Sequence, residues 1–143
     1  MKNNAFNHQN AFPPLLHMTY VLQHLSDEAL SGEVGVGLSQ VRIMSTLHPD
    51  VPRSQRRVAS QLKQTEANIS RQLRAMQQQG LVSIKRNKKD GRQRDVTLTP
   101  KGSKKYHQAQ KLLASQQNRF LRLFSKEESQ ALDRALNGLV NDL

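Results

Sequence analysis

Apolar and polar residues of this 143-residue chain follow each other mostly at the spacing of α-helices. After Pro13 and Pro14, which favour a helix start, apolar residues recur every three or four positions and predict a helix over residues 12–31, which "SGEVGVG" ends. A second helix, "QVRIMSTL", follows with Ser39 as its cap, and "HPDVP" ends it. The apolar positions of the first helix are Leu15, Met18, Leu22, Leu25 and Ala29.

Two short amphipathic helices come next, joined by the three-residue turn "KQT". Ser54 can cap the first, which runs through Leu62, and Thr65 can cap the second, over residues 66–79. Gly80 ends the second helix. Such a pair predicts a helix-turn-helix. Its inward positions are Val58, Ala59 and Leu62 in the first helix and Ile69, Leu73 and Met76 in the second.

The period then changes to two in "LVSIKR" and "RDVTLT", which predicts a β-hairpin. A two-residue loop at Asp90 and Gly91 would place the apolar residues of the two strands on opposite faces, which a half-buried ribbon cannot accept. Pairing Ile84 with Val96 puts them on one face. The loop then holds an odd number of residues centred near Asp90, and we expect a loose tip over residues 88–92.

Two more helices complete the predicted order. Thr99 as a cap, followed by a proline, starts a helix over residues 100–124. Ser125 and Glu128 form a capping box that opens a last helix over residues 126–140. Their apolar stripes are Tyr106, Ala109, Leu112, Leu113, Phe120 and Leu123 in the long helix, and Leu132, Leu136, Leu139 and Val140 in the last one.

Composition narrows the class of protein. The net charge is +11 at pH 7, which suits a polyanionic partner such as nucleic acid or an anionic membrane surface. Cysteine is absent, which excludes disulfides and thiol chemistry. No apolar run reaches membrane-spanning length, and residues 1–11 are polar and Asn-rich, so we expect no membrane association, a frayed start and a soluble cytoplasmic protein.

Positive charge is densest in residues 85–102, which hold seven Lys and Arg but only two acids. The predicted register places Arg86 opposite Arg94, and like charges facing each other across a ribbon are unfavourable. A phosphate backbone between them would reverse the sign of this interaction. We therefore expect the hairpin to be a wing that a nucleic acid completes.

With this order of elements, the chain resembles the MarR family of transcriptional regulators over nearly its whole length. The resemblance is sharpest in "QGLVSIKRNKKDGRQRDVTLTPKG", with its Gly-Leu-Val, its D-x-R wing tip and its Leu-Thr-x-x-Gly. "SQRRVASQL" and "ANISRQLRAMQQQG" are similar to the two helix-turn-helix helices of that family. Gln64 stands where the family usually has an apolar residue, so we expect a less tightly packed turn.

The resemblance implies a mostly α fold with a small β-hairpin wing (α+β), a winged helix-turn-helix with terminal dimerisation helices. Residues 1–143 would form one domain, with dimerisation helices at 12–31 and 103–143 and a DNA-binding lobe at 39–100. It further implies a homodimeric, sequence-specific regulator of a pseudo-palindromic operator on double-stranded DNA, a repressor relieved by a small aromatic or phenolic effector. A two-fold dimer would set two recognition helices on the order of 34 Å apart.

Three groups of residues are predicted to contact DNA. The exposed side of the second helix-turn-helix helix would read bases in the major groove, because Asn can pair with adenine and Arg with guanine. The start of the preceding helix suits phosphates. In the wing, Arg92 would enter the minor groove, and the family pattern implies that Asp90 orients its guanidinium. The predicted residues are Ser54, Gln55, Arg56, Arg57, Thr65, Ala67, Asn68, Ser70, Arg71, Arg74, Arg86, Lys88, Lys89, Asp90, Gly91, Arg92 and Arg94.

Simpler interpretations stand beside these. The exposed helix side could be an ordinary solvated face, Asp90-Gly91 merely a good turn dipeptide, and the terminal stripes packed within a monomer. The five histidines lack a CxxC or HExxH pattern, so neither a metal site nor any cofactor is predicted. The resemblance places an effector in a cleft that His17, Val21, His24, Met44 and His48 could line.

Two alternative functions remain. A nucleoid-coating or RNA-binding protein without sequence preference would also be basic, but it needs only phosphate contacts, and RNA readers usually carry aromatic stacking platforms. Aromatic residues make up only 4% of this chain, which disfavours RNA. An enzyme is not predicted, because no nucleophile–base set, phosphate loop or metal triad is present.

Overall fold

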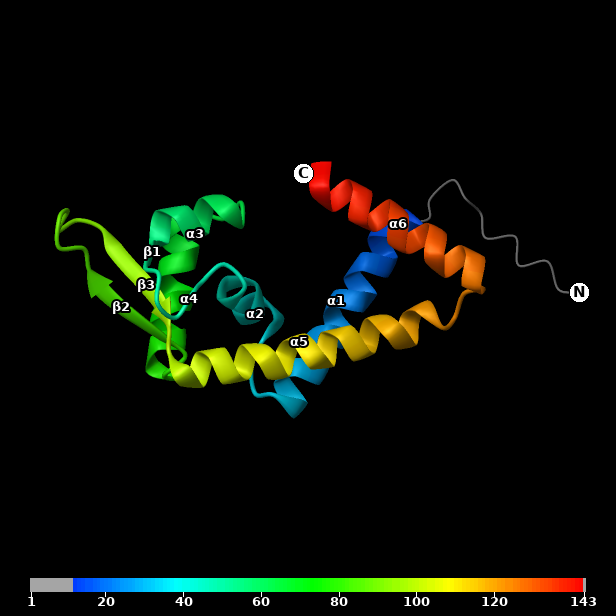
Figure 1. Ribbon diagram of the computed structural model, residues 1–143, viewed down its shortest axis with the longest axis horizontal. Helices are drawn as coiled ribbons and strands as arrows, with labels where there is room; N and C mark the ends of the chain where they lie inside the picture. Colours follow the sequence, from blue (N-terminus) through cyan, green and yellow to red (C-terminus); the bar gives the residue numbers. More distant parts are fainter. Residues whose placement is uncertain (1–11, 143) are drawn as a thin grey trace, which may run out of the picture.

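A computed structural model describes residues 12–142, so the prediction for residues 1–11 lies outside the described part of the chain. The chain forms mostly helices and one small antiparallel sheet; the wing and helix α6 lie at opposite ends of helix α5, and α1 crosses α5 between them (Figure 1). The elements are α1 (Pro14–Glu33), α2 (Leu38–Met44), β1 (Arg53–Ser54), α3 (Gln55–Gln61), α4 (Glu66–Gln78), β2 (Val82–Arg86), β3 (Arg94–Leu98), α5 (Pro100–Leu121) and α6 (Lys126–Asp142).

Helix α2 begins two residues earlier than the sequence predicted. Its cap is Gly37 rather than Ser39, because one side chain of α2 itself and one of α1 accept hydrogen bonds from the amides at its start. Oε1 of Gln40 accepts a hydrogen bond from the N–H of Gly37 at 3.0 Å, and Oδ1 of Asp27 accepts one from the N–H of Leu38 at 2.7 Å. Asp27 belongs to α1, so this cap also ties α1 to α2.

The helix-turn-helix forms as predicted. The hydroxyls of Ser54 and Thr65 accept hydrogen bonds from the N–H groups of Arg57 and Asn68, each at 3.2 Å. In the turn, Lys63 adopts a left-handed conformation with φ of 53°, where glycine is usually found. Gly80 ends helix α4 with φ of 75°, as predicted.

The hairpin has the predicted register. Val82 pairs with Leu98, Ile84 with Val96 and Arg86 with Arg94, which leaves the odd-numbered loop from Asn87 to Gln93. A third strand, β1, was not predicted from the sequence and pairs with β3, giving the order β1-β3-β2. Because β1 is only two residues long, it carries no recognisable period.

The hydrophobic core lies where α2, α3, α4 and the sheet meet. Its largest fully buried side chains are Leu30, Ile43, Met44, Val58, Ile69, Leu73, Met76 and Val96. Ala109 brings the first half of α5 against this core. The core therefore holds the helix-turn-helix and the wing as one unit, the lobe (residues 38–98), from which α5 extends towards α6 (Figure 1).

Helix α6 contributes nothing to that core. Its capping box forms as predicted, since Ser125 and Glu128 exchange hydrogen bonds at 2.8 and 3.2 Å. None of its described residues is buried, and Leu136, Leu139 and Val140 are each at least half exposed. None of the helices within residues 12–142 combines the length and the apolar character needed to cross a membrane.

Candidate nucleic-acid interface

Helix α4 turns one apolar side to the core and one polar side outward. Ile69, Leu73 and Met76 are fully buried, so the residues three and four positions apart on the opposite side face solvent. There, Ala67, Arg71 and Arg74 are exposed, and Asn68 and Ser70 are half-buried. A helix face with exposed Arg and amide groups has the size and the donors needed to contact base edges in the major groove of DNA.

A chain of side-chain hydrogen bonds crosses the start of α4. Oε1 of Gln64 accepts from Nδ2 of Asn68 at 2.8 Å and from Nε2 of Gln72 at 3.1 Å. Oδ1 of Asn68 in turn accepts from Nη2 of Arg71 at 2.9 Å. Gln64, Asn68 and Gln72 are half-buried. Gln64 is therefore held by hydrogen bonds, and the expectation of a less tightly packed turn stays a prediction.

The start of α3 carries the residues predicted to contact phosphates. Arg56 and Arg57 are exposed, Ser54 and Gln55 half-buried. Nε of Arg56 lies 3.7 Å from Oε1 of Glu66. An ion pair between two side chains as exposed as these contributes little free energy. Arg56 can therefore leave Glu66 and bind a phosphate group instead.

The wing loop is closed by its own hydrogen bonds. Oδ1 of Asn87 accepts from the backbone N–H groups of Lys89 and Asp90 at 2.8 and 2.9 Å. The carboxylate of Asp95 accepts from Nδ2 of Asn87 at 2.6 Å and from Nε2 of Gln93 at 2.9 Å. The prediction of a loose tip is wrong, because an Asx turn and a carboxylate between two amides order the loop.

Asp90 holds Arg92 differently from what the family pattern implied. Its Oδ1 accepts a hydrogen bond from the backbone N–H of Arg92 at 3.0 Å. No ion pair joins this carboxylate to the Arg92 guanidinium among the residues that the structure describes. Asp90 therefore fixes the backbone from which Arg92 extends, and the guanidinium stays exposed at the tip together with Lys88, Lys89 and Gly91.

The wing and the helix-turn-helix enclose a polar hollow of about 270 Å³. Arg86 lies opposite Arg94, as predicted, and Arg94 donates weakly from Nη1 to the carbonyl oxygen of Gly91 at 3.4 Å. The hollow is lined by the cations Arg56, Arg92 and Arg94 and by the acids Glu66 and Asp90, among others. The structure thus brings residues from α3, α4 and the wing to one site.

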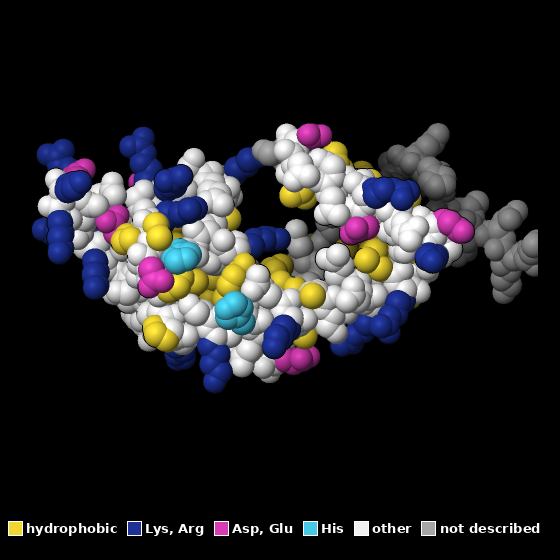
Figure 2. All heavy atoms as spheres, in the orientation of Figure 1, with side chains coloured by type: hydrophobic (Ala, Val, Ile, Leu, Met, Phe, Trp, Pro, Cys, Tyr) yellow, Lys and Arg dark blue, Asp and Glu magenta, His cyan; other side chains and the backbone are white. Residues whose placement is uncertain are grey.

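Positive charge gathers where these elements meet. Figure 2 shows Lys and Arg side chains collected at the end of the molecule formed by the wing and α3, with few acids between them. The predicted contacts at the start of α3 and in the wing meet at the polar hollow, beside Glu66 at the start of α4. The geometry is suited to a polyanion with a regular groove.

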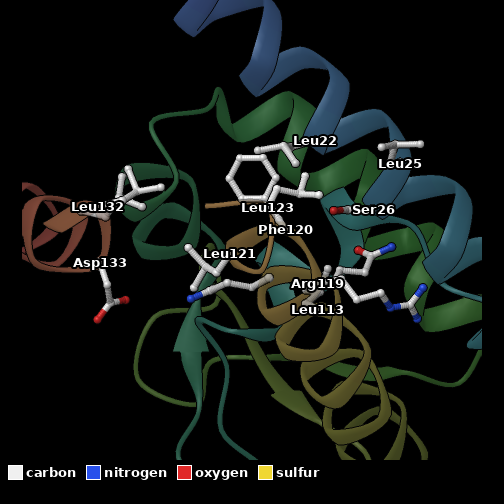
Figure 3. A pocket seen from close by; sticks show the side chains of 13 residues that line it. Leu22, Leu25, Ser26, Leu113, Arg119, Phe120, Leu121, Leu123, Leu132 and Asp133 are labelled. Carbon is white, nitrogen blue, oxygen red and sulfur yellow. The ribbon is translucent and has the colours of Figure 1, made fainter. Parts of the chain in front are cut away.

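A second hollow, of about 640 Å³, lies between α1, α5 and α6 (Figure 3). Its lining is mainly apolar, with Leu22 and Leu25 from α1, Leu113 and Phe120 from α5 and Leu132 from α6. Arg119, Gln116 and Asp133 supply polar groups. None of the five residues predicted for an effector cleft lines this hollow or the polar one.

Those five residues differ in burial, and Val21 is half-buried on α1. Met44 is fully buried in the core. Nδ1 of His48 accepts a hydrogen bond from the N–H of Asp50 at 3.0 Å, so its ring belongs to a local turn. His17 and His24 are exposed on α1, where His24 stacks on Tyr20. Within residues 12–142, no three His, Cys, Asp or Glu side chains lie close enough together to hold a metal ion.

Several residues that shape this site were missed from the sequence. Gln64 was noted only as a departure from a pattern, and Asn87, Gln93 and Asp95 were not singled out. Lys101 was also missed; its Nζ donates to the carbonyl oxygen of Gln79 at 2.7 Å and ties α5 to the end of α4. The amides at positions 64, 68 and 72, spaced by four, were the only available signal for the polar chain.

Comparison with known proteins agrees with this geometry. The family described as "Winged helix DNA-binding domain" matches residues 40–116, just over half of the chain. No curated protein sequence matches significantly.

Solved structures of similar fold cover almost the whole chain. The S. aureus MepR–DNA complex has a TM-score of 0.76 at 18% identity, over 94% of this chain and 100% of that chain. MarR has a TM-score of 0.79 at 16% identity, over 94% of both chains. The transcriptional repressor CouR, bound to a 23-mer DNA duplex, has a TM-score of 0.74 at 24% identity, over 88% of this chain and 89% of that chain.

Proposed function

Since this chain belongs to the winged helix DNA-binding domain family and has the fold of MarR, we propose that it is a dimeric, sequence-specific regulator of transcription. The observation that carries the proposal is the single cationic end on which α4, the start of α3 and the wing meet. Helix α4 would enter the major groove, and Arg92 the neighbouring minor groove.

A dimer is supported by the apolar residues that one chain leaves uncovered. Leu15, Leu16 and Leu25 of α1 and Leu136 and Leu139 of α6 are all at least half exposed. Burying such side chains against a second copy is favourable, and a two-fold axis gives each copy the same surface. Two lobes would then present their α4 helices to successive major grooves of a pseudo-palindromic operator.

Repression relieved by a small molecule is the finer part of the proposal. CouR, which shares the fold, is described as a transcriptional repressor. The apolar hollow between α1, α5 and α6 has room for a small aromatic or phenolic effector, and Arg119 at its lining could meet an anionic group. Calorimetric titration of phenol and benzoate into the dimer tests this part. Heats of injection that do not saturate would show no specific site and would contradict the proposed effector.

The central test is an anisotropy titration near physiological salt. Duplexes tiled over the upstream region of the protein's own gene would be compared with a scrambled duplex and an RNA of equal length. We expect one tile to bind at least about a thousandfold more tightly than its scramble, as specific regulators do. Equal affinity for every tile and for RNA would instead indicate a basic coating protein without sequence preference.

A further inference from the structure

The hydrogen-bonded chain Gln72–Gln64–Asn68–Arg71 has a defined direction. Arginine carries only donors, so the atom of Asn68 that faces Arg71 must be its oxygen, and its nitrogen must point to Gln64. Gln64 must then present its own oxygen, which accepts from both Asn68 and Gln72. The donor-only guanidinium of Arg71 therefore determines the orientation of each amide between it and Gln64.

This arrangement affects which base α4 can read. Recognition of adenine by Asn uses the oxygen and the nitrogen of its carboxamide together. In Asn68, the nitrogen is turned to Gln64 and the oxygen to Arg71, and the side chain is half-buried. Arg71 is exposed and keeps donors that Asn68 does not use, enough for the two hydrogen bonds to O6 and N7 of guanine.

The backbone of Gln64 is held as firmly as its side chain. Its N–H donates to the carbonyl oxygen of Ala59 at 2.9 Å, and the N–H of Lys63 donates to that of Ser60 at 3.2 Å. These bonds form a Schellman motif at the end of α3, with Lys63 in the left-handed conformation. Gln64, the acceptor shared by Asn68 and Gln72, is thus tied to the end of α3 and lies outside the helix that would contact the bases.

We propose that Gln64 and Asn68 are positioning residues for Arg71, which reads a guanine in each half-site, and that Asn68 does not itself read adenine. The inference rests on the proposed function, because it assigns a base preference to the same interface. Ordering the guanidinium before DNA arrives lowers the entropy lost when it binds. The chain through Gln64 therefore makes the preference for guanine depend on a residue that touches no base.

The test uses the full chain and the duplex that it selects from a randomised pool, with all four bases then compared at each half-site position. Arg71→Lys should lower the preference for guanine at one position by roughly tenfold, because Lys cannot form the bidentate pair in the same way. Gln64→Met, which removes the acceptor at nearly constant volume, should lower the preference at that same position by a similar factor. Gln64→Glu should retain it, since its carboxylate still accepts from Asn68.

Substitutions at Asn68 distinguish a residue that reads adenine from one that positions Arg71. Asn68→Asp keeps an oxygen for Arg71, and the Gln64 amide can turn to donate its Nε2 to the other oxygen, but Asp has no nitrogen to donate to adenine. It should therefore keep the guanine preference, even if the added charge weakens binding to every duplex. Asn68→Ala should lose that preference. Gln77→Met, at an exposed glutamine near the end of the same helix, is the matched control and should change nothing.

The outcomes tell a failure of this inference apart from a failure of the proposed function. If the unaltered protein selects no sequence, the proposed function fails and the inference with it. If it selects an operator but Gln64→Met leaves every base preference unchanged, only the inference is overturned. Loss of an adenine preference in Asn68→Asp would likewise overturn it. Thermal unfolding of each variant shows whether the protein remains folded. Should Gln64→Met fail to fold, the base preferences of Asn68→Asp supply the test instead.

Discussion

At the scale of single residues, Gly102 shows how closely α5 approaches the lobe. A Cβ added there would overlap the carbonyl oxygen of Leu81 and would lie 3.2 Å from Cδ2 of Leu98. The same carbonyl accepts a hydrogen bond from the N–H of Thr99 at 3.1 Å, and the Thr99 hydroxyl donates to Gly80 at 2.6 Å. Gly102 therefore allows the start of α5 to dock on the end of α4.

Gly102→Ala should lower the free energy of unfolding by about 1–3 kcal/mol, because backbone atoms cannot move aside for the new methyl group as a flexible side chain would. Gly32→Ala is the matched control, since nothing lies within 4 Å of a Cβ at that helical position. It should leave stability equal or up to about 1 kcal/mol higher, through the helix propensity of alanine. Urea unfolding of both variants measures the difference, and equal stabilities would contradict the close approach.

Lys63 is the one described non-glycine residue with a positive φ. A left-handed conformation costs an L-residue roughly 1 kcal/mol, and β-branched side chains tolerate it least. Lys63→Val should therefore lower the free energy of unfolding by about 1–2 kcal/mol. Lys63→Gly, which has no Cβ to clash, should cause no such loss. If both variants unfolded at the same denaturant concentration, backbone strain would not be a property of this turn.

At the scale of elements, the wing combines order with unpaired positive charge. Asn87, Gln93 and Asp95 hold the loop by hydrogen bonds, and Asp90 fixes the backbone of Arg92. Because side-chain amides and carboxylates of the loop supply this order, the cations at the tip are not used for it and remain exposed. The wing is therefore shaped before a nucleic acid arrives, and little entropy remains to be lost in the loop.

Arg92→Ala should weaken binding to specific and random duplexes alike, since a minor-groove or phosphate contact carries little base information. The slope of log K against log salt concentration should become shallower by about one per lobe bound. Anisotropy titrations at four or more salt concentrations measure this slope. Arg122→Ala, at an exposed position after α5 and away from the wing, is the control; an unchanged slope in Arg92→Ala would exclude a contact by the wing tip.

At the scale of the whole molecule, α1, α5 and α6 form an end whose apolar surface one chain cannot cover. Leu136, Leu139 and Val140 are 50%, 59% and 71% exposed, although their spacing along α6 places them on one stripe. Side chains of that kind are normally buried, and a second copy is the simplest cover. In the proposed function, operator binding would depend on the association of two chains.

Leu136→Glu should shift the protein from dimer to monomer at micromolar concentration, because a buried carboxylate without a partner is strongly unfavourable. Its lobe should stay folded, since α6 contributes nothing to the core. Equilibrium sedimentation gives the mass, and operator affinity should fall together with dimerisation. Gln130→Glu, an exposed change on the same helix with the same added charge, should remain dimeric. A monomeric unaltered protein would overturn the proposed dimer.

The sequence by itself determined whatever depends on near neighbours in the chain. Ser54, Thr65, Thr99 and Ser125 cap the helices that they were predicted to cap. Pairing Ile84 with Val96 was also predictable, because side chains alternate between the faces of a strand and this register puts the apolar residues of both strands on one face. These features follow from the geometry of hydrogen bonds within one turn and from the periods of helix and strand.

Only the tertiary structure decided the features that join distant segments. Asp27 moves the start of α2 to Gly37, and strand β1 exists because β3 lies beside it. Met44 is buried, which removes it from the predicted effector cleft. A side chain's partner across such distances depends on how whole elements pack, and no local period encodes that.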